Sequence, residues 1–150
     1  MSHVCEIDVI VRDIDALKAA CRVLGLEFRE DQKNYKWFGR FVDAYNPSDT
    51  SYNYQVSRED YGHCEHAIGI AGRKKAYEVG VMKRKDGKGF ALHYDPYDGG
   101  YGLEQVIGKN ASKLRQAYAV EVAKKQARKQ GFRVQEKVTQ DGKVRLLCTR

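Results

Sequence analysis

Two histidines and a cysteine lie close together in the stretch EDYGHCEHAIGIAG. His63, Cys64 and His66 are residue types that bind zinc, and cysteine with histidine is also the pair used in thiol catalysis. On a strand, Cys64 and His66 would point to one face and His63 to the other. His3 and Cys5 repeat this spacing near the N-terminus. A Cys2His2 site would therefore form if the two strands met in the right register.

The same spacing is more typical of ordinary side chains on a strand than of a metal or catalytic site. Ligands two residues apart on one strand lack the C-x2-C spacing of zinc knuckles. Neighbours on a strand point to opposite faces, which separates Cys64 from His63 as a nucleophile and base. A metal-binding protein or enzyme built on His63, Cys64 and His66 is thus the third of three hypotheses, and neither a bound metal nor another cofactor is predicted.

The four cysteines, at positions 5, 21, 64 and 148, are too widely spaced for a dense disulfide framework. Cys21 and Cys148 lie in segments with the pattern of buried elements. Both are predicted to act as small apolar residues. The glycine-containing stretches DGKGF and DGGYG lack the lysine-serine ending of a phosphate-binding loop.

The composition is that of an ordinary globular protein, with 150 residues of which 42% are hydrophobic and 31% charged. We predict one domain over residues 1–150. No apolar run approaches the ~20 residues of a membrane helix, and the N-terminus lacks the features of a signal peptide. The expected location is cytoplasmic, with no membrane partner.

Strand and helix periodicities alternate along the chain. They predict strands over 3–12, 26–30, 64–71, 76–83, after Asp86-Gly87 and twice within 132–149, with helices over 13–24 and 109–130. The first strand, helix and second strand would form a β-α-β unit, with Asp13 and Gly25 at the two ends of its helix. Asp86-Gly87 predicts a hairpin with a type I′ turn, and Asp141-Gly142 predicts a second Asp-Gly hairpin turn.

The longest periodic segment is the helix over 109–130. Apolar residues recur on one side of it and predict a core-facing stripe: Ala111, Leu114, Tyr118, Ala119 and Val122. Asn110 or Ser112 is expected to cap its start and Gly131 to end it.

These elements predict a single α+β domain. Its antiparallel or mixed sheet would have about five to seven strands, with two main helices packed on it. Residues 31–62 break the pattern, because they combine aromatic residues with turn formers. We expect an irregular, aromatic-rich excursion over the surface there.

The formal net charge of +7 and the pI near 9.2 favour polyanionic partners. Basic residues gather on the long helix and in one turn: Lys113, Lys124, Lys125, Arg128 and Lys129, and Arg73, Lys74 and Lys75. Tyrosines between such residues could stack on bases while the cations bind phosphates. Lysines near a helix C-terminus are also expected from the helix dipole alone. A nucleic-acid-binding protein using the basic helix face is the second hypothesis.

Three stretches together resemble a known family. They are the opening from MSH to the LG at 24–25, the segment AYEVGVMKRKDGKGFALHYD, and the ending from Tyr118 to the DGK-x-RL stretch. They are similar to the hypothetical chloroplast open reading frame thirty-five family of algal plastids, cyanobacteria and phages. The resemblance does not cover 31–62, supports His3 but not the other residues of the metal hypothesis, and departs from the family's paired tryptophan after Asp95.

The family has no established activity, so the resemblance implies a fold and a partner rather than a reaction. Genes of the family often lie near those of AAA-type ATPases, which makes such an ATPase a candidate protein partner. The first hypothesis is therefore a non-catalytic binding or adaptor module that engages a protein. Its expected contact residues are the aromatic ones: Tyr35, Trp37, Phe38, Tyr52 and Tyr54.

Overall fold

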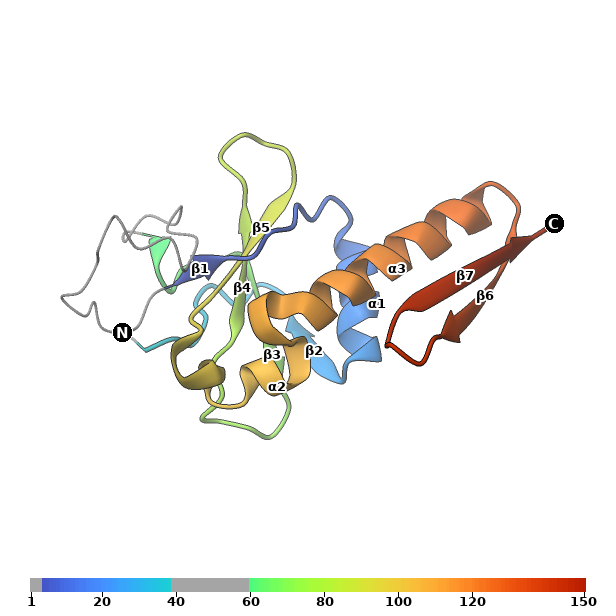
Figure 1. Ribbon diagram of the computed structural model, residues 1–150. Coiled ribbons are helices and arrows are strands. Elements are labelled where there is room, and N and C mark those ends of the chain that lie inside the picture. Colours follow the sequence, from blue (N-terminus) through green and yellow to red (C-terminus); the bar gives the residue numbers. More distant parts are fainter. Residues whose placement is uncertain (1–3, 39–59) are drawn as a thin grey trace, which may run out of the picture.

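The computed structural model describes residues 4–38 and 60–150. Its helices and strands are, in order, β1 (Cys5–Glu6), α1 (Ile14–Val23), β2 (Leu26–Arg29), β3 (His66–Ile70), β4 (Val79–Lys83), β5 (Phe90–Tyr94), α2 (Leu103–Ile107), α3 (Ser112–Lys129), β6 (Arg133–Val138) and β7 (Val144–Thr149). Five strands form one antiparallel sheet, and β6 and β7 form a separate hairpin (Figure 1). The predicted α+β fold is confirmed.

The strand order in the main sheet is β1-β5-β4-β3-β2. The consecutive strands β3, β4 and β5 are neighbours, as the hairpin signals indicate. The predicted β-α-β unit spans the whole sheet, because β1 and β2 take opposite edges and three strands lie between them. No helix in the described part of the chain has the length and apolar character needed to cross a membrane.

The prediction of one strand over 3–12 is wrong for most of that stretch. The ladder with β5 is two residues long, and Val11 pairs again with Phe90 as an isolated bridge. A hydrogen bond from the amide of Val9 to the carbonyl of Ile7, 2.8 Å long, tightens the chain between these points. This three-residue turn interrupts the strand.

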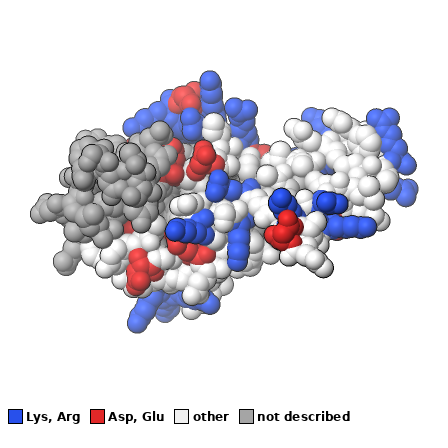
Figure 2. Space-filling model, in the orientation of Figure 1, with Lys and Arg blue, Asp and Glu red and all other residues white. Residues whose placement is uncertain are grey.

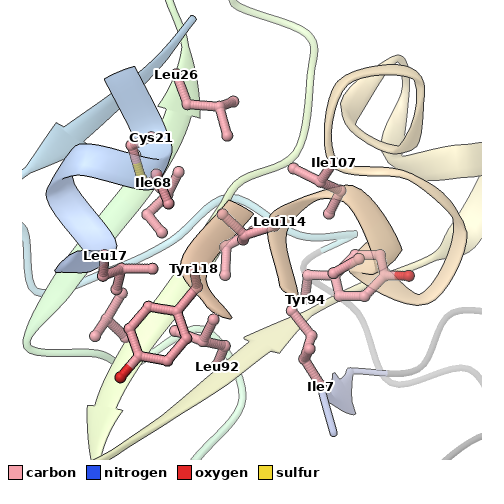
Figure 3. Packing of buried hydrophobic residues seen from close by; sticks show 14 of the residues in the cluster. Ile7, Leu17, Cys21, Leu26, Ile68, Leu92, Tyr94, Ile107, Leu114 and Tyr118 are labelled. Carbon is pink, nitrogen blue, oxygen red and sulfur yellow. The ribbon is translucent and has the colours of Figure 1, made fainter. Parts of the chain in front are cut away.

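The main core lies between the sheet and the helices (Figure 3). Leu17 and Cys21 from α1 meet Ile68 and Leu92 from the sheet, and all four are almost fully buried. The ends of α1 are as predicted. The Asp13 carboxylate accepts a hydrogen bond from the amide of Ala16 at 3.0 Å, and Gly25 adopts a φ of +71° just after the helix.

The long helix α3 has its buried residues in its first half. Ala111, Leu114 and Tyr118 are buried, and the Tyr118 hydroxyl accepts a hydrogen bond from the amide of Arg12 at 3.0 Å. Ala119 is exposed, contrary to the predicted stripe, because it lies about 100° around the helix from Tyr118 and so faces away from the core. Val122 is partly buried against the same core.

Neither predicted residue caps the start of α3. Asn110 belongs to a preceding 3-10 turn, Ser112 is already helical, and Ala111 holds the capping position with no side-chain bond. The type I′ prediction at Asp86-Gly87 is also wrong, because Gly87 has a positive φ and Asp86 does not. A bond from the Gly87 amide to the Arg84 carbonyl closes the turn instead.

The other face of the sheet carries a second, smaller cluster around Tyr35, Tyr61 and Cys64. The ring of Tyr35 lies directly against Gly80, where a Cβ atom would come within 2.3 Å of it. The buried Asp95 carboxylate accepts hydrogen bonds from the amides of Phe38 at 3.1 Å and Tyr97 at 2.9 Å. These contacts hold residues 35–38 against the sheet.

Candidate nucleic-acid interface

The second half of α3 and the β6–β7 hairpin, residues 124–150, extend away from the five-stranded sheet (Figure 1). We call this part the C-terminal arm. The chain reverses at Gly131, whose φ is +87°, and a hydrogen bond from the amide of Phe132 to the carbonyl of Ala127 fixes the reversal. The hairpin turn is tied back to α3 by Gln116, whose side-chain amide donates to the Gly142 carbonyl at 3.1 Å.

One face of the hairpin rests on α3. Cross-strand partners Val134–Cys148, Glu136–Leu146 and Val138–Val144 share this inner face. Only part of it is covered: Leu146 is half-buried, whereas Cys148 is exposed. The predicted burial of Cys148 is therefore wrong, because an alternating pattern does not reveal that a two-stranded hairpin lacks a second covering layer.

The net charge of the protein lies entirely in the arm. Residues 124–150 contain nine Lys and Arg against two Asp and Glu, which gives a formal charge of +7. The remaining 123 residues contain eighteen of each kind and are formally neutral. Figure 2 shows the same division on one face: Lys and Arg lie at the outer end of the arm without acidic neighbours, whereas both signs are interspersed on the body.

Two of the predicted helix lysines are neutralised by carboxylates. Lys124 Nζ lies 3.0 Å from both Glu121 and Glu136, and Lys125 Nζ lies 2.7 Å from the Asp13 carboxylate. The hydrogen bond to Glu121 raises the pKa of Lys124, and the hydrogen bond to Asp13 raises that of Lys125. These lysines therefore brace the hairpin and the body rather than supply free charge.

The arm also carries cations without such partners. Within the described residues, no carboxylate forms an ion pair with any of five exposed side chains: Arg128, Lys129, Arg133, Lys137 and Arg145. Lys143 lies 3.8 Å from Asp141 in the turn, and the Arg150 guanidinium lies 4.7 Å from the ring of Phe132. The free charge of the arm is thus concentrated on the hairpin and the end of α3.

Sequence reasoning identified Arg128 and Lys129 but missed the hairpin cations. Helical spacing groups the α3 cations on one surface, whereas the hydrophobic alternation of the hairpin strands carries no information about their charge. A running count of charge along the chain would have found them, since the imbalance begins at Lys124 and continues to the C-terminus. Lys113 lies near the start of α3, outside the arm.

The other predicted basic group, Arg73, Lys74 and Lys75, lies in the turn between β3 and β4. This turn is at the bottom of Figure 1, away from the arm. Lys36 donates a hydrogen bond from its ammonium group to the carbonyl of Lys74. A separate surface pocket of about 360 Å³ is lined by Lys36, Arg73 and Lys74, with Arg29 and Glu78. A role for this turn in binding stays a prediction.

The histidine and cysteine residues of the metal hypothesis do not converge. Cys5 is on β1 and His66 on β3, with two strands between them, so the strand pairing that a Cys2His2 site would require does not occur. Cys64 packs beside Tyr35 on one face of the sheet and donates its thiol hydrogen to the Gln32 carbonyl. His66 instead lies against Phe28, with ring centres 5.3 Å apart.

His63 is exposed, and His3 lies outside the described residues. Burial raises the pKa of the Cys64 thiol to about 12, which opposes thiolate chemistry. Among residues 4–38 and 60–150, no three His, Cys, Asp or Glu side chains are grouped as metal ligands would be.

Of the predicted aromatic contact residues, three are described by the structure, and all three pack against other parts of the protein. Tyr35 is buried against Gly80, so its ring serves packing. Trp37 packs edge-on against Tyr61 at 5.2 Å, and Phe38 packs against Tyr97 at 5.2 Å. Tyr52 and Tyr54 lie outside the described residues, as does most of the predicted excursion over 31–62.

A residue that sequence reasoning overlooked is His93 on β5. It lies beside a pocket of about 320 Å³ whose lining includes Glu6, Asp60 and Arg84. Burial lowers the pKa of His93 to about 4, so the imidazole is neutral at pH 7. Its Nδ1 atom is buried and has no hydrogen-bond partner in the described part of the chain, while Nε2 is 3.8 Å from the Glu6 carboxylate, too far for a hydrogen bond.

Comparison with known proteins adds no further guide to the site. The chain matches no family model, and neither the curated proteins nor the solved structures give a match. The family resemblance of the two ends and the central hairpin stays a prediction, and the function must be argued from the geometry above.

Proposed function

We propose that the protein is a non-catalytic binding module that engages nucleic acid through its C-terminal arm. The segregation of charge supports this proposal most strongly: the arm carries +7 and the body is formally neutral. Five of the arm's exposed cations lack a carboxylate partner within the described residues. Closely spaced cations repel one another, and a polyanion that neutralises them gains affinity by releasing its own counterions.

The proposal changes the order of the hypotheses set by sequence. The described aromatic residues of the protein-partner hypothesis are engaged in packing, and the Cys-His hypothesis lacks a convergent ligand set among the described residues. An adaptor role, including one toward an AAA-type ATPase, stays a prediction that centres on residues 31–62.

The test is fluorescence anisotropy of labelled nucleic acid with two matched variants. The arm variant changes Arg128, Lys129 and Arg133 to Gln. The control variant changes Arg73, Lys74 and Lys75 to Gln and so removes the same charge from the body. Each phosphate contact contributes about 0.9 to the slope of log affinity against log salt, so three contacts account for a roughly 40-fold loss between 50 and 200 mM salt.

We expect the wild-type protein to bind with a steep salt dependence, the arm variant to lose about three units of slope, and the control to keep the wild-type slope. Equal losses in the two variants would show that charge in general, and not the arm, governs binding. Absence of binding at 50 mM salt would refute the proposed function.

A further inference from the structure

The hairpin presents two chemically different faces. Residues that are directly paired across the strands share a face, and the register assigns Arg133–Thr149, Gln135–Leu147 and Lys137–Arg145 to the face opposite α3. All six of these side chains are exposed. The alternate pairs include the half-buried residues and Glu136, which bonds to Lys124 on α3. We call the exposed row the outer ribbon face.

The outer ribbon face has an unfavourable pair at the end nearest the hairpin turn. Lys137 and Arg145 lie directly opposite each other, and like charges in this position destabilise a two-stranded ladder. No carboxylate of the described residues pairs with either side chain. An anion lying across the ribbon would relieve this repulsion. The pair therefore does not stabilise the fold, but it could bind an anionic ligand.

The other side chains of this face suggest what kind of anion it is. Gln135 and Thr149 offer hydrogen-bonding groups, and Leu147, 50% exposed, offers an apolar contact. In the DNA major groove, arginine and lysine pair with guanine, glutamine pairs with adenine, and apolar groups contact the thymine methyl. Phosphate binding alone would require none of the three uncharged residues.

The dimensions agree with this chemistry. A ribbon of two strands about 4.8 Å apart and about 20 Å long fits the major groove of B-form DNA, which is about 12 Å wide and admits a two-stranded ribbon. Arg128 and Lys129 lie near one end of the ribbon, and Lys143 lies in the turn at the other. With the ribbon lying along the groove, cations at both of its ends can contact phosphates that border the groove.

We propose that the arm binds double-stranded DNA by placing the outer ribbon face in the major groove. This inference rests on the proposed function and makes it more specific. Duplex RNA is excluded by its geometry, because the A-form major groove is too deep and narrow for side chains to read. Single-stranded DNA offers phosphates but no groove.

The test compares affinity for a 20-base-pair DNA duplex, an RNA duplex of the same sequence and its single DNA strand, at one salt concentration. A fourth ligand is the DNA duplex with 7-deazapurines, which removes the N7 acceptors of the major groove and leaves the charge unchanged. The ribbon variant Gln135→Ala with Thr149→Ala is also uncharged, and its matched control is Gln105→Ala with Ser112→Ala, two exposed positions outside the arm.

We expect the DNA duplex to bind at least tenfold more tightly than the other two forms, and the 7-deaza duplex and the ribbon variant each to lose about fivefold or more. The control should bind as the wild type does. Equal affinity for all three forms would overturn the inference and leave the proposed function standing. A duplex preference that survives the 7-deaza change would also overturn it, and no binding to any ligand would overturn both.

Discussion

The buried histidine His93 gives the body of the protein a predicted dependence on pH. Its side chain is 8% exposed, and burial lowers its pKa from 6.5 to about 4 in the folded protein. The unfolded chain therefore binds a proton at His93 more readily than the folded protein does. The stabilising contribution is complete above pH 6.5, and it is lost as the pH falls from 6.5 to about 4.

The size of this effect follows from the two pKa values. One pKa unit corresponds to 1.36 kcal/mol, so His93 should remove roughly 1 kcal/mol of unfolding free energy at pH 5.5 and about 3 kcal/mol at pH 4, relative to pH 7.5. The 3.8 Å approach of Glu6 does not offset this loss, because the imidazole stays neutral over most of the range.

The measurement is urea unfolding at pH 7.5, 5.5 and 4 for the wild type and for His93→Gln, whose side chain is polar but does not titrate. The other titrating groups are common to both proteins, so the difference between their pH dependences isolates His93. The wild type should lose about 3 kcal/mol more than the variant between pH 7.5 and 4. Equal losses, or an NMR titration of His93 centred near 6.5, would refute the reasoning.

Three further substitutions test the packing of the body, each by urea unfolding at pH 7.5. Leu114→Ala should lower the free energy of unfolding by about 2–5 kcal/mol, since it opens a cavity in the fully buried core. A loss below ~1 kcal/mol would mean that this part of α3 does not pack as described. Gly80→Ala should cost roughly 1–3 kcal/mol, because its Cβ would lie 2.3 Å from the Tyr35 ring, and a neutral result would contradict that contact. Asp95→Asn should lower the free energy of unfolding by about 1–3 kcal/mol, because an amide has one acceptor oxygen for the two backbone donors at Phe38 and Tyr97. Unchanged stability would argue against both hydrogen bonds.

Local signals were sufficient at the two ends of α1, but not at the start of α3 or for the turn type at Asp86-Gly87. The capping residues Asp13 and Gly25 lie where the helix pattern predicted them, because their bonds are made within a few residues of chain. The order of strands across the sheet could not be predicted in this way. The β1 edge depends on pairing Cys5 with Tyr94, far away in sequence, and periodicity does not identify a strand's partner.

In the candidate site too, the sequence pattern did not reveal which residues are buried or which charges are free. The alternation around Cys148 is that of a strand with one covered face, but it does not reveal that the cover is a single helix. His93 gave no sequence signal, since a lone histidine on a strand becomes unusual only when, as here among the described residues, its nitrogen is buried without a hydrogen-bond partner. The concentration of charge after Lys124 was visible in the sequence, but the division into a braced inner face and a free outer face requires the hairpin register.

The most direct test of the central claim is an NMR titration of the isotope-labelled protein with a short DNA duplex, following each backbone amide. Binding through the arm predicts that the largest shift changes fall within residues 124–150, strongest at Arg133, Lys137 and Arg145, while the turn that contains Lys74 stays unperturbed. Shift changes centred on that turn, or on the aromatic segment near Trp37, with the arm unchanged, would contradict the account.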